Sequence, residues 1–244
     1  MFNNLFATLA AFLWVLPLGI AAPPQAVHLP EDEFVLPPYL KTVKGGILNL
    51  RTPDHQYAAE AGEWLDLNQT YNLSEKMAVQ VLWNEQLQWV GGGVLKMKAA
   101  EAVWTKPASP YRLEIERGIV AVWVSAPSSE KFIEIKTEKE KFTAFNAVLW
   151  VIARPGSTEV YLHQGSITDS SGKVWNGKKY IRYQNSGMGV STEWNAEAYK
   201  VKIAGVYSNL VKLIEQGQKE WDDGVVTEVY SAARKKGWRK TLRK

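Results

Sequence analysis

The sequence predicts a mainly β protein with two facing sheets, built as a sandwich or a short solenoid, and with a C-terminal α-helical extension. Between residues 45 and 183, apolar and polar residues alternate with a period of two, and turn residues interrupt the pattern at short intervals. After that region, apolar residues recur at every third or fourth position, as on one face of a helix. A chain of 244 residues, of which 46% are hydrophobic, is long and apolar enough to form a substantial core.

Residues 1–22 have the features of a secretory signal peptide. Residues 5–22 are apolar or small and uncharged, Pro17 interrupts them near their end, and Ala21-Ala22 are small enough for signal peptidase. We therefore expect a cleaved signal and a periplasmic or secreted protein. The lack of Cys is more typical of the bacterial periplasm than of a disulfide-rich setting. The alternative is a retained N-terminal membrane anchor, because residues 5–22 are just long enough to span a bilayer.

Three regions follow the signal. Residues 23–44 are expected to form an extended, proline-rich lead-in, of which residues 23–38 are not expected to pack. Residues 45–183 form the β domain, and residues 184–244 form a helical extension that ends in a basic tail.

Two local patterns in the β domain predict particular strands and turns. Residues 119–124 are apolar at every position, which indicates a strand that is buried on both faces. Asn176-Gly177 is a favoured pair for a tight hairpin.

The helical extension begins with an apolar stripe. Tyr199, Ile203, Val206, Leu210 and Leu213 are separated by three or four positions, which predicts one long helix that packs on the β domain. Glycine is a common helix terminator, so Gly217 is expected to end this helix. A second, shorter helix is expected after Asp223-Gly224.

Four segments of the β region follow one another in a characteristic order. Residues 62–67 (GEWLDL) correspond to a G-x-W-x-x-L pattern, 113–120 (LEIERGIV) to L-x-x-G-x-V, 132–137 (FIEIKT) to F-x-V-x-T, and 160–167 (VYLHQGSI) to V-x-V-x-x-G-x-V. In this order the chain resembles the FecR domain, the periplasmic module of iron-siderophore sensor proteins and of many standalone envelope proteins. The resemblance covers roughly residues 45–183 and implies a β fold that binds or senses without catalysis.

The chain departs from the family at one turn. Where the family has a Gly-Thr pair, this sequence has Asn146-Ala147. Asn tolerates a left-handed backbone better than most residues, so the turn is expected to survive without the Thr hydroxyl. Family members that act as anti-sigma regulators carry a cytoplasmic helical domain before their membrane segment. Only four residues precede the apolar segment here, so we expect no sigma-factor partner.

Catalytic motifs are weak in this sequence. The chain has no Cys and three His, no Gly-x-Ser-x-Gly elbow and no spacing typical of metal ligands. Glu60, Glu63 and Asp66 flank Trp64 and could supply a carboxylate pair for sugar hydrolysis, but the polar face of a strand or turn explains them more simply. We therefore predict no catalytic residue, no cofactor and no metal, and keep an enzyme of unknown type as a third hypothesis.

Tryptophan provides the candidate contact residues. The chain has 11 Trp, of which Trp64, Trp83 and Trp89 lie among polar residues and are candidates for ligand or partner contact. Half-exposed Trp83 and Trp89 would suit a carbohydrate-binding β-sandwich, whereas burial in the core is the commoner fate of Trp.

The C-terminal tail carries the excess positive charge. The chain has a net charge of +4, and residues 231–244 contribute +7 without an acidic residue, which leaves −3 for residues 1–230. The candidate residues for contact with an anionic lipid or polymer are Arg234, Lys235, Lys236, Trp238, Arg239, Lys240, Arg243 and Lys244. No nucleic-acid partner is expected, because the tail contains no motif that reads bases. The sequence therefore predicts an exported, non-catalytic protein that recognises an envelope protein or a glycan.

Overall fold

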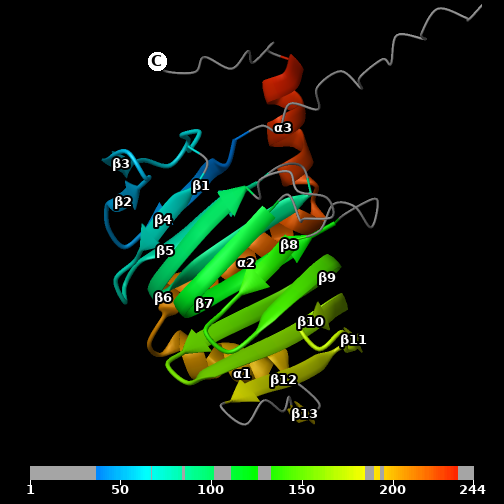
Figure 1. Ribbon diagram of the computed structural model, residues 1–244. Coiled ribbons are helices and arrows are strands. Elements are labelled where there is room, and N and C mark those ends of the chain that lie inside the picture. The colour runs from blue at the N-terminus through cyan, green and yellow to red at the C-terminus, as the bar shows by residue number, and fades with distance from the viewer. Residues whose placement is uncertain are drawn as a thin grey trace, which may run out of the picture. The chain divides into compact units, whose positions relative to one another are not determined.

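The computed structural model describes residues 37–66, 68–83, 86–101, 111–125, 133–184, 190–192 and 195–235 (Figure 1). The predicted signal peptide and residues 23–36 of the lead-in lie outside these residues. The strands are β1 (Tyr39–Lys44), β2 (Leu48–Arg51), β3 (Gln56–Ala59), β4 (Gln69–Asn72), β5 (Ala78–Leu82), β6 (Leu87–Glu101), β7 (Tyr111–Val124), β8 (Ile133–Lys136), β9 (Lys141–Arg154), β10 (Ser157–Asp169), β11 (Val174–Asn176), β12 (Lys179–Gln184) and β13 (Val190–Thr192). The helices are α1 (Ala196–Ala204), α2 (Ser208–Asp222) and α3 (Val225–Lys235).

The strands form one mixed sheet that is folded into two layers. In the first layer the strand order is β13-β12-β10-β9-β7-β6-β5-β1, and in the second it is β3-β2-β4-β6-β7-β8-β9-β10-β11. The four long strands β6, β7, β9 and β10 cross from one layer to the other. Among the strands that the structure describes, only β8 pairs in parallel, with β7.

Ring contacts show that the two layers face each other. Trp83 precedes β6, whereas Tyr111 pairs with Glu101 at the far end of β6. A straight strand of this length would hold the two rings about 45–50 Å apart, yet their centroids are 5.2 Å apart. The facing layers predicted from the sequence are therefore present, but they are halves of one hydrogen-bonded sheet and not two separate sheets.

Residues with positive φ lie where the long strands bend. They are Val94 in β6 (φ 59°), Gly118 in β7 (φ 115°), Asn146 in β9 (φ 50°) and Gly165 in β10 (φ 82°). Asn146 has the left-handed backbone that its residue type tolerates. The bends are tightly packed, because a Cβ at Gly165 would lie 1.8 Å from the carbonyl oxygen of Asn146.

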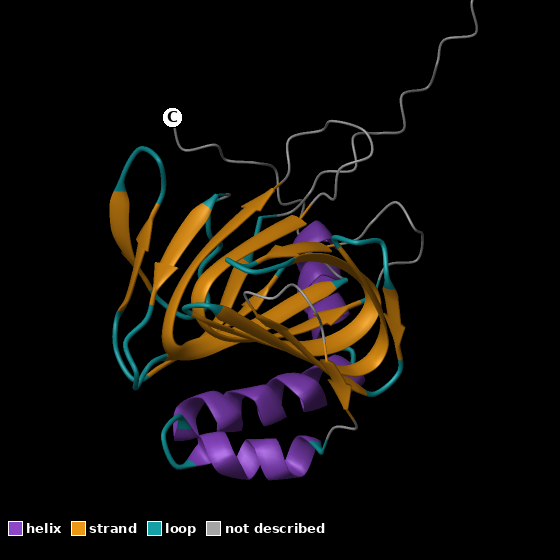
Figure 2. Ribbon diagram, turned by 60° about the horizontal axis from the view of Figure 1, so that its bottom comes forward, coloured by secondary structure: helices purple, strands orange, loops and turns teal. Residues whose placement is uncertain are grey.

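The main core lies between the two layers of the sheet, and a second cluster of buried apolar residues lies between the sheet and the helices α1 and α2. Residues 119–124 are buried at every position, as predicted. Val120 and Val122 point into the core between the layers. Ile119 and Trp123 pack on the other face of the sheet, with α1 and α2 (Figure 2).

The helical extension differs from the prediction in two ways. The apolar stripe is divided between α1 and α2, because the helix breaks at residues 205–207 and leaves Val206 exposed. Gly217 does not end a helix but lies buried inside α2, where a Cβ would be 3.0 Å from the Gln88 amide and 3.2 Å from Val90. The lack of a side chain at this position lets α2 approach the sheet closely. The short helix predicted after Gly224 is confirmed as α3.

The end of the lead-in belongs to the sheet, and one turn prediction is wrong. Residues 39–44, which were expected to be extended, form β1 with Leu40 fully buried. Asn176-Gly177 does not turn a hairpin, since β11 and β12 both pair with β10 and the Gly177 amide donates to Gly165. In the part of the chain that the structure describes, no helix is long and apolar enough to cross a membrane.

Candidate functional site

Two of the three Trp candidates are in the core. Trp83 is 1% exposed and Trp89 is fully buried, with its ring edge-on to Tyr71 at 4.8 Å. The hypothesis that they are half exposed is wrong, because the bend in the sheet brings the opposite layer over both rings. Neither side chain can serve as a platform for a sugar in this structure.

Trp64 is the candidate that remains at the surface, where it is half-buried. It lies on the segment 60–66, which follows β3 in the chain. This segment runs from β3, at the edge of the second layer, alongside β1, at the edge of the first. The backbone of this segment pairs with β1: the Leu40 amide donates to Glu63 at 2.8 Å, and the Gly62 amide donates to Leu40 at 2.7 Å. Residues 60–66 thereby link the two layers along one edge.

Two tyrosines hold the Trp64 ring. Tyr39 of β1 lies 5.0 Å from it and Tyr230 of α3 lies edge-on at 5.4 Å, as centroid distances. The Tyr230 hydroxyl is itself fixed, 2.8 Å from the Leu82 carbonyl oxygen and 3.1 Å from that of Pro37. The indole is therefore held by residues from two distant parts of the chain, β1 and α3.

Exposed carboxylates lie on the same segment as Trp64. Glu60, Glu63 and Asp66 are all exposed, and residues 52–75 contain no Lys or Arg. We call Tyr39, Glu60, Glu63, Trp64 and Asp66 the Trp64 surface; the buried Tyr230 supports its indole. The Trp64 surface combines fixed aromatic rings with negative charge, which suits a partner that presents cationic and apolar groups.

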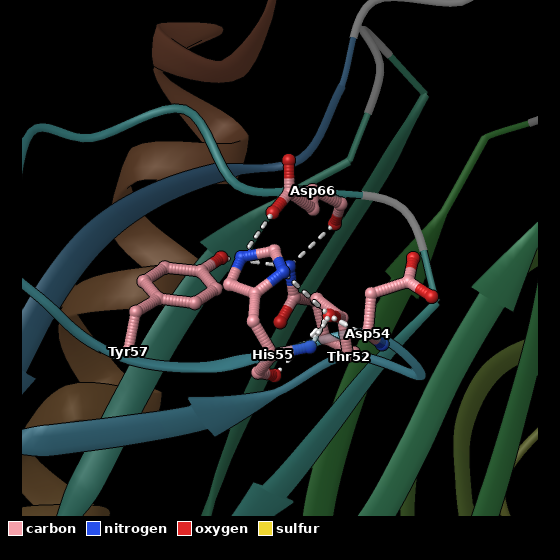
Figure 3. A network of polar contacts seen from close by, with 6 residues as sticks. Thr52, Asp54, His55, Tyr57 and Asp66 are labelled. Atoms are coloured by element: carbon pink, nitrogen blue, oxygen red, sulfur yellow. Dashed lines mark hydrogen bonds and ion pairs between the residues drawn. The ribbon is translucent and has the colours of Figure 1, made fainter. Parts of the chain in front are cut away.

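A polar network lies beside this surface (Figure 3). The His55 ring is 3.1 Å from the Thr52 hydroxyl through Nδ1 and 3.5 Å from the Asp66 carboxylate through Nε2. It also stacks on Tyr57 at 5.3 Å. A hydroxyl, an imidazole and a carboxylate in series resemble the arrangement of a catalytic triad.

The bonding of Thr52 argues against a nucleophile. Its hydroxyl accepts hydrogen bonds from the Asp54 and His55 amides and lies 3.2 Å from the His55 carbonyl oxygen, inside the turn between β2 and β3. Thr52 is also only 7% exposed. The hydroxyl is occupied in stabilising the turn, and an approaching substrate would have to displace these bonds.

The network extends inward to a buried amide. Gln69, 1% exposed, donates through Nε2 to the Tyr57 hydroxyl at 2.8 Å and to the Asp66 carbonyl oxygen at 2.9 Å. Its Oε1 is buried without a hydrogen-bond donor among the described residues. Burial raises the pKa of Tyr57 above its ordinary value, so the phenol stays neutral at physiological pH.

Sequence reasoning missed several members of this site. Thr52, His55, Tyr57 and Gln69 carry no recognisable motif, and only the turn at residues 52–55 could have been suspected, from Pro53-Asp54. Tyr230 is 193 positions from the Pro37 oxygen that it contacts, which no local pattern could reveal. Within the described ranges, no three His, Asp or Glu side chains come together as metal ligands.

Most of the basic tail candidates lie beyond the described residues. Arg234 and Lys235 are the last two residues of α3. The other tail candidates, Lys236, Trp238, Arg239, Lys240, Arg243 and Lys244, lie outside the part that the structure describes.

No protein-family model matches the sequence, and no curated protein is similar to it. Two crystal structures from Parabacteroides distasonis ATCC 8503, each of a provisionally assigned anti-sigma factor, resemble it in fold. One is 13% identical with a TM-score of 0.45 over 56% of this chain. The other is 14% identical with a TM-score of 0.47 over 57%. This chain covers 65% and 64% of their lengths, slightly less than two thirds. A likeness this low assigns no function to the chain.

Proposed function

We propose that the protein is an exported, non-catalytic binding protein of the FecR type, and that it recognises an envelope protein through the Trp64 surface. The observation that carries the proposal is the combination of a held indole and exposed carboxylates at the edge where segment 60–66 links the two layers. Aromatic side chains are enriched in the centres of protein interfaces. A ring that is already fixed by Tyr39 and Tyr230 loses little conformational entropy on binding.

The fold supports the resemblance to the FecR family at one specific turn. Asn146, which replaces the family glycine, has a φ of 50° and lies against Gly165. The segment 160–167, which matches the clearest family pattern, lies within β10 and includes Gly165, where β10 bends.

The non-catalytic part of the proposal is supported by the bonding of Thr52. The one hydroxyl that contacts the His55 ring is held by two backbone amides in a turn. Substrate turnover that depended on Thr52 or His55 would contradict this part of the proposal.

Site-specific photocrosslinking tests the proposed partner surface. A photoreactive residue at Glu63 should capture an envelope protein of one defined mass, whereas the same residue at Glu215, an exposed carboxylate on α2, should not. Reversing the charge with Glu60→Lys in the Glu63 photoreactive protein should weaken the capture, because electrostatic complementarity is lost. Equal capture at both positions, or capture that depends on added glycan alone, would contradict a protein partner at this surface.

We also propose that the basic tail contacts an anionic lipid or polymer of the envelope. The observation that favours this role is the firm attachment of α3, whose Val226, Tyr230 and Ala233 are buried. α3 therefore fixes the position on the protein from which the basic tail begins.

A further inference from the structure

The tail and the Trp64 surface begin at the same place. Tyr230 lies edge-on to Trp64, and Arg234 follows it by one helical turn, a rise of about 6 Å along α3. Because Tyr230 is held by Leu82 and packed in the core, this starting point does not depend on the conformation of the tail.

Among the described residues, no Lys or Arg pairs with the carboxylates of the Trp64 surface. Among the described residues, neither Glu60 nor Glu63 forms an ion pair; Glu63 instead accepts a hydrogen bond from the Glu60 amide at 3.0 Å. In the part of the chain that the structure describes, Asp66 forms an ion pair only with His55, at 3.5 Å. The exposed carboxylates can therefore accept charge-assisted hydrogen bonds from a basic segment.

The tail supplies the complementary groups and can reach them. Residues 236–244 contain five Lys or Arg, one Trp and no acidic residue. When extended, nine residues span up to about 30 Å, which is ample for a surface that begins beside Tyr230. A short tether of this kind gives an effective concentration in the millimolar range.

We propose that residues 236–244 fold back onto the Trp64 surface of their own molecule, with basic side chains against Glu60, Glu63 and Asp66 and with Trp238 supplying the apolar contact. This contact between the tail and the Trp64 surface does not depend on the proposed function, but its consequence does. An envelope protein would bind the Trp64 surface and an anionic lipid or polymer would bind the tail, so either partner must first displace the internal contact. The tail would then compete with the envelope protein, and the Trp64 surface would compete with the anionic lipid or polymer.

A zero-length carbodiimide crosslinker tests the contact directly. It joins a carboxylate to a Lys amine as an amide, with loss of water taken up by the reagent, only where the two groups touch. In the purified full chain, we expect amides between Lys236, Lys240 or Lys244 and the carboxylates of residues 60–66, identified by mass spectrometry of the monomer. They should disappear in about 1 M salt, where the screening length is about 3 Å.

Matched carboxylates provide the control. Glu75, Glu215 and Asp223 are equally exposed but lie elsewhere, so they should remain uncoupled to the tail. If tail lysines couple to these three residues as often as to residues 60–66, or couple to none of them, the proposal is overturned.

Mixing ¹⁴N and ¹⁵N protein distinguishes a second copy from the same chain. At micromolar protein, products within one chain should exceed mixed-isotope products by about 100-fold, given a millimolar effective concentration. Mixed products at the statistical level would mean that the tail binds a neighbouring molecule, which would also overturn the proposal.

Vesicle binding separates this inference from the proposed function. With Glu60→Gln, Glu63→Gln and Asp66→Asn together, binding to phosphatidylglycerol vesicles should strengthen about threefold or more, because the competitor is removed. The control variant Glu75→Gln, Glu215→Gln and Asp223→Asn removes the same charge and should change binding less. Crosslinks without any vesicle binding would disprove the lipid role alone.

Discussion

At the scale of single residues, the bends of the long strands depend on backbone conformations that few side chains allow. Asn146 turns β9 at a φ of 50°, and Gly165 turns β10 at a φ of 82° directly against it. Asn reaches the left-handed region because its short polar side chain bonds locally, whereas a β-branched residue there is strained. The left-handed backbone of Asn146 could be predicted from its residue type; the packing of Gly165 on it could not, since it requires the register of β9 on β10.

Gly165→Ala should destabilise the protein more than Gly172→Ala. Both glycines have a φ of 82°, so alanine costs about 1–2 kcal/mol of backbone strain at either position. A Cβ at Gly172 meets nothing within 4 Å, whereas one at Gly165 meets the Asn146 carbonyl at 1.8 Å. We expect the clash to add about 1–3 kcal/mol or more to the loss in free energy of unfolding, measured in urea. Equal losses for the two variants would show that β9 and β10 do not bend against each other in this way.

Asp169 is a second residue with a demanding environment. It is 8% exposed, and one carboxylate oxygen accepts from the Ser171 and Lys173 amides while the other accepts from the Trp175 indole at 3.0 Å. Burial alone would raise the pKa of Asp169, but the hydrogen bonds from Ser171, Trp175 and Lys173 outweigh it and lower the pKa below its ordinary value. The ionised form is therefore the one that the fold stabilises.

The stability that Asp169 provides should be lost in acid. Because its pKa is lower in the folded than in the unfolded state, the contribution is complete above the ordinary carboxyl pKa and falls as pH drops through the lower, folded pKa. Asp169→Asn should cost about 1–3 kcal/mol at neutral pH, through the lost charge-assisted hydrogen bonds. The gap between the wild type and the variant should narrow in acid, below the ordinary carboxyl pKa. Urea unfolding at a series of pH values measures it, and a gap that is constant with pH would contradict the assignment.

At the scale of elements, α2 docks through polar as well as apolar contacts. The fully buried Gln80 donates to Gln88 at 3.1 Å and to Glu220 of α2 at 2.7 Å. Gln88 in turn donates to the Gly217 carbonyl oxygen at 2.9 Å. These bonds set the position of α2 along the sheet, since apolar packing alone tolerates sliding.

Gln80→Met should loosen α2 specifically. The substitution keeps the side-chain volume but leaves Gln88 Oε1 without its donor in the interface, at a cost of about 1–3 kcal/mol. Hydrogen exchange of the α2 amides should accelerate with it. Gln216→Met removes a bond to the same Glu220 on the exposed side and should cost less than about 0.5 kcal/mol. If both variants behave alike, the buried network does not determine the docking of α2.

The elements that sequence analysis misplaced share a physical cause. Gly217 has the residue type of a helix end, but its role is set by the approach of Gln88 and Val90 from the sheet. Likewise, an extended lead-in could be predicted up to residue 44, but the burial of Leu40 depends on β5 and segment 60–66, which flank β1. Local patterns predict which residues are extended or helical; the partners that they meet come from distant parts of the chain.

At the scale of the whole molecule, contacts between distant parts of the chain also decide which of the three Trp candidates are buried. The alternation around Trp83 and Trp89 correctly predicts strands, but only the folding of the sheet onto itself decides that both rings are covered. Trp64 stays at the surface because segment 60–66 passes along the edge of the layers and not between them. The candidate site could therefore be located in part, through Trp64 and its neighbouring carboxylates. Its network of Thr52, His55 and Gln69 depends on tertiary contacts.

The charges of the whole chain are divided between an acidic segment and a basic one. Residues 52–75 carry five acidic residues and no Lys or Arg, while residues 231–244 carry seven basic residues and no acidic one. α3 places the start of the second segment beside the first, through Tyr230 and Trp64. A modest net charge of +4 therefore conceals two opposed regions, and the outcome of removing one of them can be stated in advance.

Deleting residues 236–244 should abolish binding to an anionic surface and leave the fold intact. The deletion removes five positive charges and changes the net charge from +4 to −1, while every described residue of α3 remains. Sedimentation with phosphatidylglycerol vesicles should show binding of the full chain at low salt. Each basic residue near such a surface contributes about 1 kcal/mol, so the deleted protein should stay in the supernatant. The circular dichroism spectrum and the unfolding midpoint should change little, because the buried residues of α3 are Val226, Tyr230 and Ala233.

A variant with Trp238→Ala alone separates charge from insertion of the indole, since it keeps all five cations. Vesicle binding that persists after the deletion would place the anionic-surface site in the β domain and would refute the role of the tail.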